Sequence, residues 1–172
     1  YGGIGKNVVN PALAARVFLF LSFSESMSSF VLPHAGHAGE VDAVASATPL
    51  ALLQKGTVPD VSLLDMFLGE MPGCIGEVSV TMLLLGGVYL LLRKVITWHI
   101  PVSYILTVAV IALIFPTGDM TSVEFMLYQL CSGGLMLGAF FMATDYVTSP
   151  ATNTGRIVYG IGCGLITMFI RY

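Results

Sequence analysis

Charged residues are scarce in this sequence of 172 residues: they make up 10% of it, whereas a soluble domain carries about 25%. With a net charge of −3, the chain also lacks the basic surface that nucleic-acid binding requires, so that class of partner is excluded. Hydrophobic residues account for 56% of the sequence, and the mean hydropathy is +0.87. This composition predicts an integral membrane protein.

Residues that bind metals or act as nucleophiles are few and poorly spaced. The three cysteines have no paired spacing, so each is interpreted as a small buried hydrophobe: Cys74, Cys131 and Cys163. His34 and His37 are three residues apart, but neighbouring glycines and the lack of a nearby third ligand argue against a metal site. The sequence also lacks a Ser-His-Asp set, a phosphate-binding loop and a dinucleotide glycine motif. No catalytic residue and no metal ligand is predicted.

Long apolar runs dominate what is present, and a bilayer crossing takes about 20 such residues. Five candidate spans follow one another: 11–32, 78–96, 101–116, 124–143 and a run from Ile157. The first opens with Asn10 as N-cap and proline at the first helical position. The sequence therefore predicts an all-α, polytopic transmembrane helix bundle. The chain begins without Met and ends directly after an apolar run, so we expect an internal fragment of a longer protein whose last span is truncated.

Charges between the spans predict their orientation. Basic residues collect on one side, together with one acid, Asp145: Lys6, Arg93, Lys94 and Arg156. Acidic residues dominate the other side, which has Lys55 as its one base: Glu40, Asp42, Asp60, Asp65, Glu70, Glu77, Asp119 and Glu124. The positive-inside rule places the basic side in the cytoplasm. Three regions result: 1–32, a cytoplasmic start and first span; 33–77, an extracytoplasmic loop with a short surface helix within 59–73; and 78–172, four further spans.

Two acids and two glycine pairs stand out in the spans. Glu25 lies within the first span among serines, and an ionisable group there is costly, which makes it a candidate for an ion path. Asp145, after the fourth span, is a second candidate. The alternative for Glu25 is a carboxyl satisfied by serine hydroxyls, and the alternative for Asp145 is a helix-end or turn carboxylate. The glycine pairs are four residues apart, which predicts close helix packing or, alternatively, room for a flat ligand: Gly134 with Gly138, and Gly160 with Gly164.

The segment VDAVASATPLA (41–51) lies in the longest stretch of the chain that is not plainly apolar. Thr48 has no histidine at a fixed spacing that could serve as its base, so catalysis by its hydroxyl is not expected. The small neighbours Ala45, Ser46 and Ala47 keep that hydroxyl accessible. Pro49 biases Thr48 toward an extended backbone. Thr48 therefore suits an acceptor for a modifying enzyme. An ordinary turn of small residues is the alternative.

The stretch DAVASAT (42–48) resembles the acceptor motif for covalent flavin attachment, with Ala45 where that motif often has Ser or Thr and Ser46 where it often has Gly. Four other segments resemble, in this order along the chain, the D-type membrane subunit of the Rnf complexes: GGIGKNVVNPA (2–12), GCIGEVS (73–79), ITWHIPVSYI (96–105) and GGLMLGAFFMATDYVTSP (133–150). They are also similar to the B-type membrane subunit of the sodium-translocating NADH:quinone reductases. The resemblance covers nearly the whole chain.

This resemblance implies a fold and a cofactor. The fold would be the second half of an inverted-repeat architecture like that of urea transporters. FMN would be joined through its phosphate to the Thr48 oxygen, within a motif that includes Asp42, Ser46 and Ala47. Lys55 would pair with the phosphate, or would be an ordinary solvated loop lysine. The related quinone reductase subunit holds a second, non-covalent flavin, which this sequence does not place.

The function implied is that of a subunit relaying electrons in an ion-translocating ferredoxin:NAD⁺ oxidoreductase, inactive when isolated. Its partners would be the other membrane subunits, the peripheral flavin and iron–sulfur subunits, a flavin transferase, Na⁺ or H⁺, and lipid of the inner (plasma) membrane. Two alternatives stay open. One is a channel or transporter with Glu25 and Asp145 on its pathway, and the other is a membrane anchor whose loop has lost its flavin.

Overall fold

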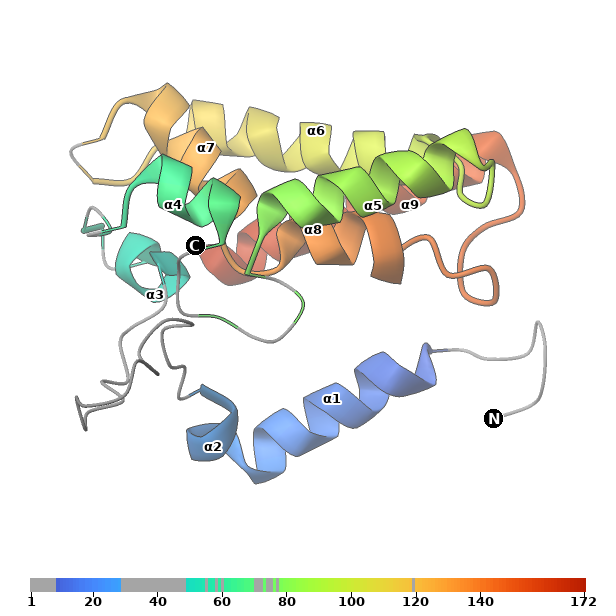
Figure 1. The fold of residues 1–172 in the computed structure, drawn as a ribbon, viewed down its shortest axis with the longest axis horizontal. Helices are drawn as coiled ribbons and strands as arrows, with labels where there is room; N and C mark the ends of the chain where they lie inside the picture. The colour runs from blue at the N-terminus through green and yellow to red at the C-terminus, as the bar shows by residue number, and fades with distance from the viewer. Residues whose placement is uncertain are drawn as a thin grey trace.

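The computed structural model describes residues 9–28, 49–54, 56–57, 59, 61–69, 73, 76, 78–118 and 120–172. Within these ranges every regular element is helical, which confirms the predicted all-α class (Figure 1). The elements are α1 (Pro11–Ser22), α2 (Ser24–Ser28), α3 (Pro49–Gln54), α4 (Leu63–Leu68), α5 (Val80–Leu92), α6 (His99–Ile114), α7 (Ser122–Cys131), α8 (Leu135–Leu137), the π-helical turn η1 (Gly138–Met142) and α9 (Asn153–Arg171). The predicted inverted repeat stays a prediction.

Helices α6 and α9 form the closest-packed pair, and the glycines of α9 explain why. A Cβ on Gly164 would lie 2.7 Å from the Thr107 Cβ and 3.1 Å from the Tyr104 carbonyl oxygen. A Cβ on Gly160 would collide with the Ser103 Oγ. Both glycines therefore let the two backbones approach, as small residues do between membrane helices. The close helix packing predicted from the spacing of Gly160 and Gly164 is therefore confirmed.

The predicted fourth span is wrong as a single helix. Helix α7 ends at Cys131, and a new helical segment, α8 followed by η1, starts at Leu135 at an angle of 63°. Gly133 and Gly134 between them both have φ of +65°, a left-handed conformation that costs other residues roughly 1–2 kcal/mol. Gly134 therefore serves the break rather than helix packing. Gly138, its predicted partner, begins η1.

Most of the remaining helices lie where the sequence predicts a helix, but they differ from the predicted ranges in length. Asn10 caps α1 as expected, because its Oδ1 accepts a hydrogen bond from the backbone N–H of Ala12 at 3.0 Å. The first predicted span, however, is interrupted at Phe23, after which α2 begins. Helix α4 lies inside the predicted surface helix. Helix α3 was not predicted, although a proline at its first position is a start signal.

The outer surface of the bundle is apolar. The side chains of Leu21, Leu92 and Phe169 are 77%, 77% and 85% exposed, respectively. Soluble monomers rarely expose apolar patches of large size. By length and composition, no single helix in the described ranges is sufficient to cross a bilayer, whereas α7 together with α8–η1 is sufficient as a bent pair. The prediction of five crossings stays a prediction.

Basic residues gather at one end of the bundle. The start of α1, the end of α5 and the start of α9 lie at one end, and α2, α3, α4 and the C-terminus lie at the other (Figure 1). Arg93 and Lys94 follow α5, and Arg156 lies in the first turn of α9, so the described basic residues expected in the cytoplasm do gather at one end. The side of the membrane that this end faces stays a prediction.

Candidate functional site

A cleft separates α1 from the rest of the bundle, and we call it the α1 cleft. It consists of two adjoining cavities of about 400 Å³ and 390 Å³. The walls that both cavities share come from three parts of the chain: Leu13 of α1, Tyr104 and Thr167 of the α6–α9 pair, and Gly138 and Met142 of η1. Each cavity falls within the size range of small-molecule sites, roughly 300–1,000 Å³.

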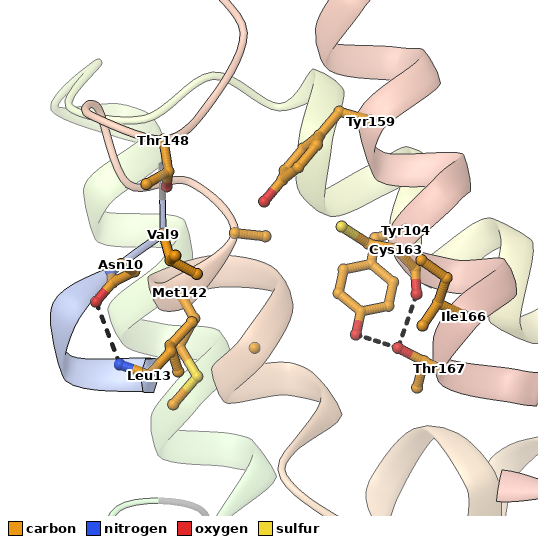
Figure 2. A pocket seen from close by; sticks show the side chains of 12 residues that line it. Val9, Asn10, Leu13, Tyr104, Met142, Thr148, Tyr159, Cys163, Ile166 and Thr167 are labelled. Atoms are coloured by element: carbon orange, nitrogen blue, oxygen red, sulfur yellow. Dashed lines mark hydrogen bonds between the residues drawn. The ribbon is translucent and has the colours of Figure 1, made fainter. Parts of the chain in front are cut away.

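The first cavity, which we call the tyrosine lobe, is lined by Tyr104, Tyr159 and Cys163 among others (Figure 2). The hydroxyls of Tyr104 and Thr167 are 2.6 Å apart, and the Thr167 Oγ1 donates to the Cys163 carbonyl oxygen at 2.8 Å. A threonine hydroxyl has one proton, so Tyr104 is the donor in the first bond. These bonds fix one polar wall of the lobe, on the α6–α9 side.

Asp145 holds two residues that line the tyrosine lobe and connects one of them, Asn10, to the loop after η1. Its Oδ2 accepts hydrogen bonds from the Asn10 Nδ2 and the Thr148 Oγ1, both at 3.2 Å. Both donors line the lobe. Because Asn10 is also the cap of α1, Asp145 connects the first turn of that helix to the loop after η1. This geometry supports the helix-end interpretation of Asp145, and its place on an ion path stays a prediction.

Glu25 lies far from Asp145. It is exposed on α2, at the opposite end of α1 from Asn10 (Figure 1). The 12 residues of α1 span about 18 Å. The structure therefore does not bring the two carboxyl groups together, and the ion-path role predicted for Glu25 stays a prediction.

The second cavity, which we call the arginine lobe, is lined by Arg16, Leu50 and Arg171 among others. The Arg171 side chain is 6% exposed. Its Nη1 donates to the carbonyl oxygen and the Oε1 of Gln129 at 2.6 and 2.9 Å, and its Nη2 donates to the Ser132 carbonyl oxygen at 2.9 Å. Carbonyl groups at a helix end have no partner within the helix. Arg171 thus satisfies the end of α7 at the break.

The sequence analysis predicted no role for Arg171, the penultimate residue of this sequence. One signal was available: an arginine at the end of an apolar helix needs a polar environment, and the adjacent glycines Gly133 and Gly134 mark a break that exposes carbonyl groups. Recognising the pairing required knowing that the end of α9 lies against the end of α7.

Helix α3 docks on the bundle beside Arg171. The Leu50 Cδ2 and the Arg171 Nη2 lie 2.6 and 3.1 Å, respectively, from the position that a Cβ on Gly133 would occupy. Leu53, one turn further along α3, is 1% exposed and belongs to the core cluster that also contains Phe125. The helix is therefore held both by core packing and by the wall of the arginine lobe.

The residues of the predicted flavin site lie outside the described ranges: Asp42, Ser46, Ala47, Thr48 and Lys55. The described chain resumes at Pro49, which is buried, and Leu50 lines the arginine lobe. Thr48 is joined directly to Pro49 by a peptide bond. The sequence thus connects the predicted acceptor to a residue packed on the bundle and, one position later, to a wall of the α1 cleft.

A helical bundle with an apolar exterior, a broken helix and a cleft beside α1 is the architecture of a polytopic membrane protein. The chain belongs to the NQR2, RnfD, RnfE family, whose model matches residues 1–172. The family resemblance expected from the sequence segments is confirmed.

Individual relatives support this membership. The chain is 48% identical over 174 residues to the D subunit of the Na⁺-translocating ferredoxin:NAD⁺ oxidoreductase complex of Acetobacterium woodii, covering 99% of this chain and 51% of that protein. It is 40% identical to the D subunit of the proton-translocating ferredoxin:NAD⁺ oxidoreductase complex of Clostridium ljungdahlii (99% and 53% covered). It is 38% identical to the B subunit of the Na⁺-translocating NADH-quinone reductase of Azotobacter vinelandii (99% and 43% covered). The chain spans about half the length of these relatives.

Proposed function

We propose that this chain is part of a membrane flavoprotein subunit that carries FMN on Thr48 and relays electrons in a redox-driven ion pump coupling ferredoxin and NAD. Three facts support the proposal: the family, the names of the relatives, and the acceptor-like stretch 42–48. One structural observation carries it: the residues directly after Thr48 are packed into the wall of the α1 cleft. Relatives named for Na⁺ and for protons both match this chain, so either ion suits the proposal.

The described residues fit a bound flavin. The α1 cleft combines apolar walls, such as Leu13 and Met142, with a few converging polar groups, such as Tyr104 and Arg171. That mixture is typical of cofactor sites. When bound, the flavin supplies the redox chemistry, which protein side chains do not provide.

The chain's own residues then have positioning roles. Pro49 and Leu53 anchor the segment directly after Thr48 on the bundle. The bond from Tyr104 to Thr167 orients one polar wall, and Asp145 holds the start of α1 through Asn10. The Thr48 oxygen would lose its proton and bond to the phosphorus of an activated flavin phosphate, whose phosphoanhydride bond would break so that its second phosphate group leaves. A flavin transferase would catalyse this step.

In-gel flavin fluorescence tests the attachment. The full-length subunit is co-expressed with its flavin transferase and denatured, beside Thr48→Ala, Thr48→Ser and Thr57→Ala. Thr57 is the matched control: its hydroxyl is exposed, lies outside the motif and donates to the Leu52 carbonyl oxygen. We expect fluorescence from the wild type and Thr57→Ala, none from Thr48→Ala, and some from Thr48→Ser.

A dark wild-type band, with the transferase active on another acceptor, would refute flavin attachment at Thr48. Solute flux through the purified subunit in vesicles, without redox partners, would then indicate the channel or transporter. Absence of flux together with normal assembly of the complex would indicate the membrane anchor.

A further inference from the structure

We propose that the turn between α5 and α6, residues 93–98, binds the headgroup of an anionic phospholipid. We call this segment the α5–α6 turn. Arg93 and Lys94 contact the lipid phosphate, and Trp98 lies beside the glycerol region of the same lipid. The inference goes beyond the proposed function and does not depend on it, because it concerns another surface of the bundle and another ligand.

Two adjacent cations on the α5–α6 turn provide the first argument. Arg93 and Lys94 are exposed, and neither side chain forms a hydrogen bond or an ion pair with another described residue. The start of α9 lies at the same end of the bundle (Figure 1), but the guanidinium of Arg156 there donates to the Pro150 carbonyl oxygen and the Asn153 Oδ1. Within the described ranges, Arg93 and Lys94 are therefore the cations at this end whose donors can all turn to a ligand.

The backbone at Lys94 provides the second argument. Helix α5 ends in a Schellman motif, in which the N–H of Lys94 donates to the Leu91 carbonyl oxygen and the N–H of Val95 to the Leu90 carbonyl oxygen, both at 3.0 Å. Lys94 holds the left-handed position of this motif with φ of 56°, and among the described residues it is the only non-glycine with a positive φ. Glycine is usual there because it has no Cβ. Strain kept on an exposed residue points to a function of its side chain.

Exposed apolar side chains beside the cations favour a lipid over a free anion. Leu92 and Val95 are exposed, and Trp98 is 57% exposed. The Trp98 ring stacks on the His99 ring with centroids 4.2 Å apart, and its indole N–H has no partner within the described chain. Tryptophan is enriched at membrane–water interfaces because its ring is largely apolar and its N–H is polar. Cations bordered by such side chains match a molecule that has both a phosphate and acyl chains.

The turn is also fixed before any ligand binds. Ile96 is buried in a core cluster that contains Val80 and Met136. Its neighbours Val95 and Thr97 are exposed. The buried isoleucine thus holds the turn against the bundle between its cations and its tryptophan. A fixed backbone loses little conformational freedom when a headgroup binds.

Photo-cross-linking in bilayers of defined composition tests the site. The full-length subunit, in its complex, is placed in phosphatidylcholine nanodiscs with a trace of photoactivatable phosphatidylglycerol or, in parallel, photoactivatable phosphatidylcholine. Mass spectrometry compares lipid adducts on the peptide containing residues 93–98 with adducts around Phe169, an exposed residue near the other end of α9. Each cation near a membrane surface favours an anionic lipid about 5-fold, so we expect phosphatidylglycerol to exceed phosphatidylcholine by about 5- to 30-fold at the turn and to show no such excess at Phe169.

The variants separate charge from backbone conformation. Arg93→Gln and Lys94→Gly should each lower the preference about 5-fold, and Lys94→Arg should keep it. Lys94→Gly should at the same time raise the unfolding temperature in phosphatidylcholine, because glycine relieves the left-handed position. Arg156→Gln is the matched control: it removes the same charge at the same end, but from a guanidinium held by its own segment, so the preference should change less than about 2-fold. The side chains of Arg93 and Lys94 are exposed, so these variants should assemble normally.

Equal adducts of the two lipids at the turn, no adduct of either, or a preference unchanged in the double variant Arg93→Gln/Lys94→Gly would overturn the inference. A preference abolished by excess sn-glycerol 3-phosphate would overturn it in favour of a soluble phosphate ester. Equal adducts together with loss of another subunit from the complex of the double variant would overturn it in favour of an acidic protein partner. A preference that resists the soluble phosphate and disappears in the double variant, while the complex stays intact, would establish the lipid site.

Discussion

Replacing Gly160 by alanine tests the packing of α6 on α9 most directly. The added Cβ would collide with the Ser103 Oγ and would lie 2.9 Å from the Ile100 carbonyl oxygen. The serine hydroxyl is held by the His99 carbonyl oxygen at 2.6 Å, and the Ile100 carbonyl belongs to the helix backbone. Neither group can retreat cheaply, so the two helices must separate or distort.

The chain supplies its own control in Gly162, two residues further along α9. A Cβ there would meet nothing within 4 Å. Both substitutions gain roughly 1 kcal/mol of helix propensity, because alanine replaces glycine in each. Only Gly160→Ala carries the overpacking cost of about 1–3 kcal/mol. The difference between the variants therefore isolates helix–helix packing from propensity.

Thermal unfolding of the purified full-length subunit in detergent measures this difference. For a subunit about twice as long as this chain, 1 kcal/mol shifts the unfolding temperature by about 1.4 °C, so Gly160→Ala should unfold about 1–4 °C below Gly162→Ala. In the Ser103→Ala background, Gly160→Ala should lower the unfolding temperature by less than it does in the wild type, because the serine hydroxyl is gone. Part of the loss should remain, because the Ile100 carbonyl oxygen is still close. Equal unfolding temperatures for the two glycine variants would refute the claim that Gly160 sets the approach of α6.

Three further outcomes follow from single contacts. Arg171→Leu should destabilise the subunit by about 3–5 kcal/mol, because the α7 end loses its buried charged donors; a loss no larger than that of Arg156→Leu in the same thermal scan would contradict the capping role. Asn10→Ala should cost about 1 kcal/mol and speed hydrogen exchange in the first turn of α1, and Asn10→Ser should keep the cap; identical exchange in both variants would argue against it. Leu53→Ala should cost about 2–5 kcal/mol and slow electron transfer in the complex while flavin attachment persists; unchanged electron transfer would show that α3 docking has no such role.

Elements that depend on local pattern could be predicted from the sequence. The apolar runs located α5, α6 and α9 to within a few residues, and Asn10-Pro11 marked the start of α1. Caps, prolines and hydrophobic runs act over a few residues, so the sequence alone carries them. The spacing of Gly160 and Gly164 predicted their packing for the same reason: it describes one face of one helix.

Elements that depend on tertiary context could not be predicted in the same way. The run 124–143 is apolar throughout, and hydropathy does not register that two adjacent glycines adopt a left-handed conformation. Arg171 pairs with carbonyl groups about 40 residues earlier in the chain, a relation that no local pattern encodes. The cleft escaped prediction as well, because its walls come from α1, α3, α6, η1 and α9 together.

Helix α3 is the element that connects the predicted acceptor to the fold. A helix of six residues is not stable in isolation, so packing must hold it. Leu53 provides that packing, since full burial of a leucine contributes about 1.5–3 kcal/mol. A segment that only had to reach a modifying enzyme would gain nothing from such an anchor. An anchor beginning at the residue after Thr48 is instead what the proposed function requires, because a tethered cofactor would have to keep its position after attachment.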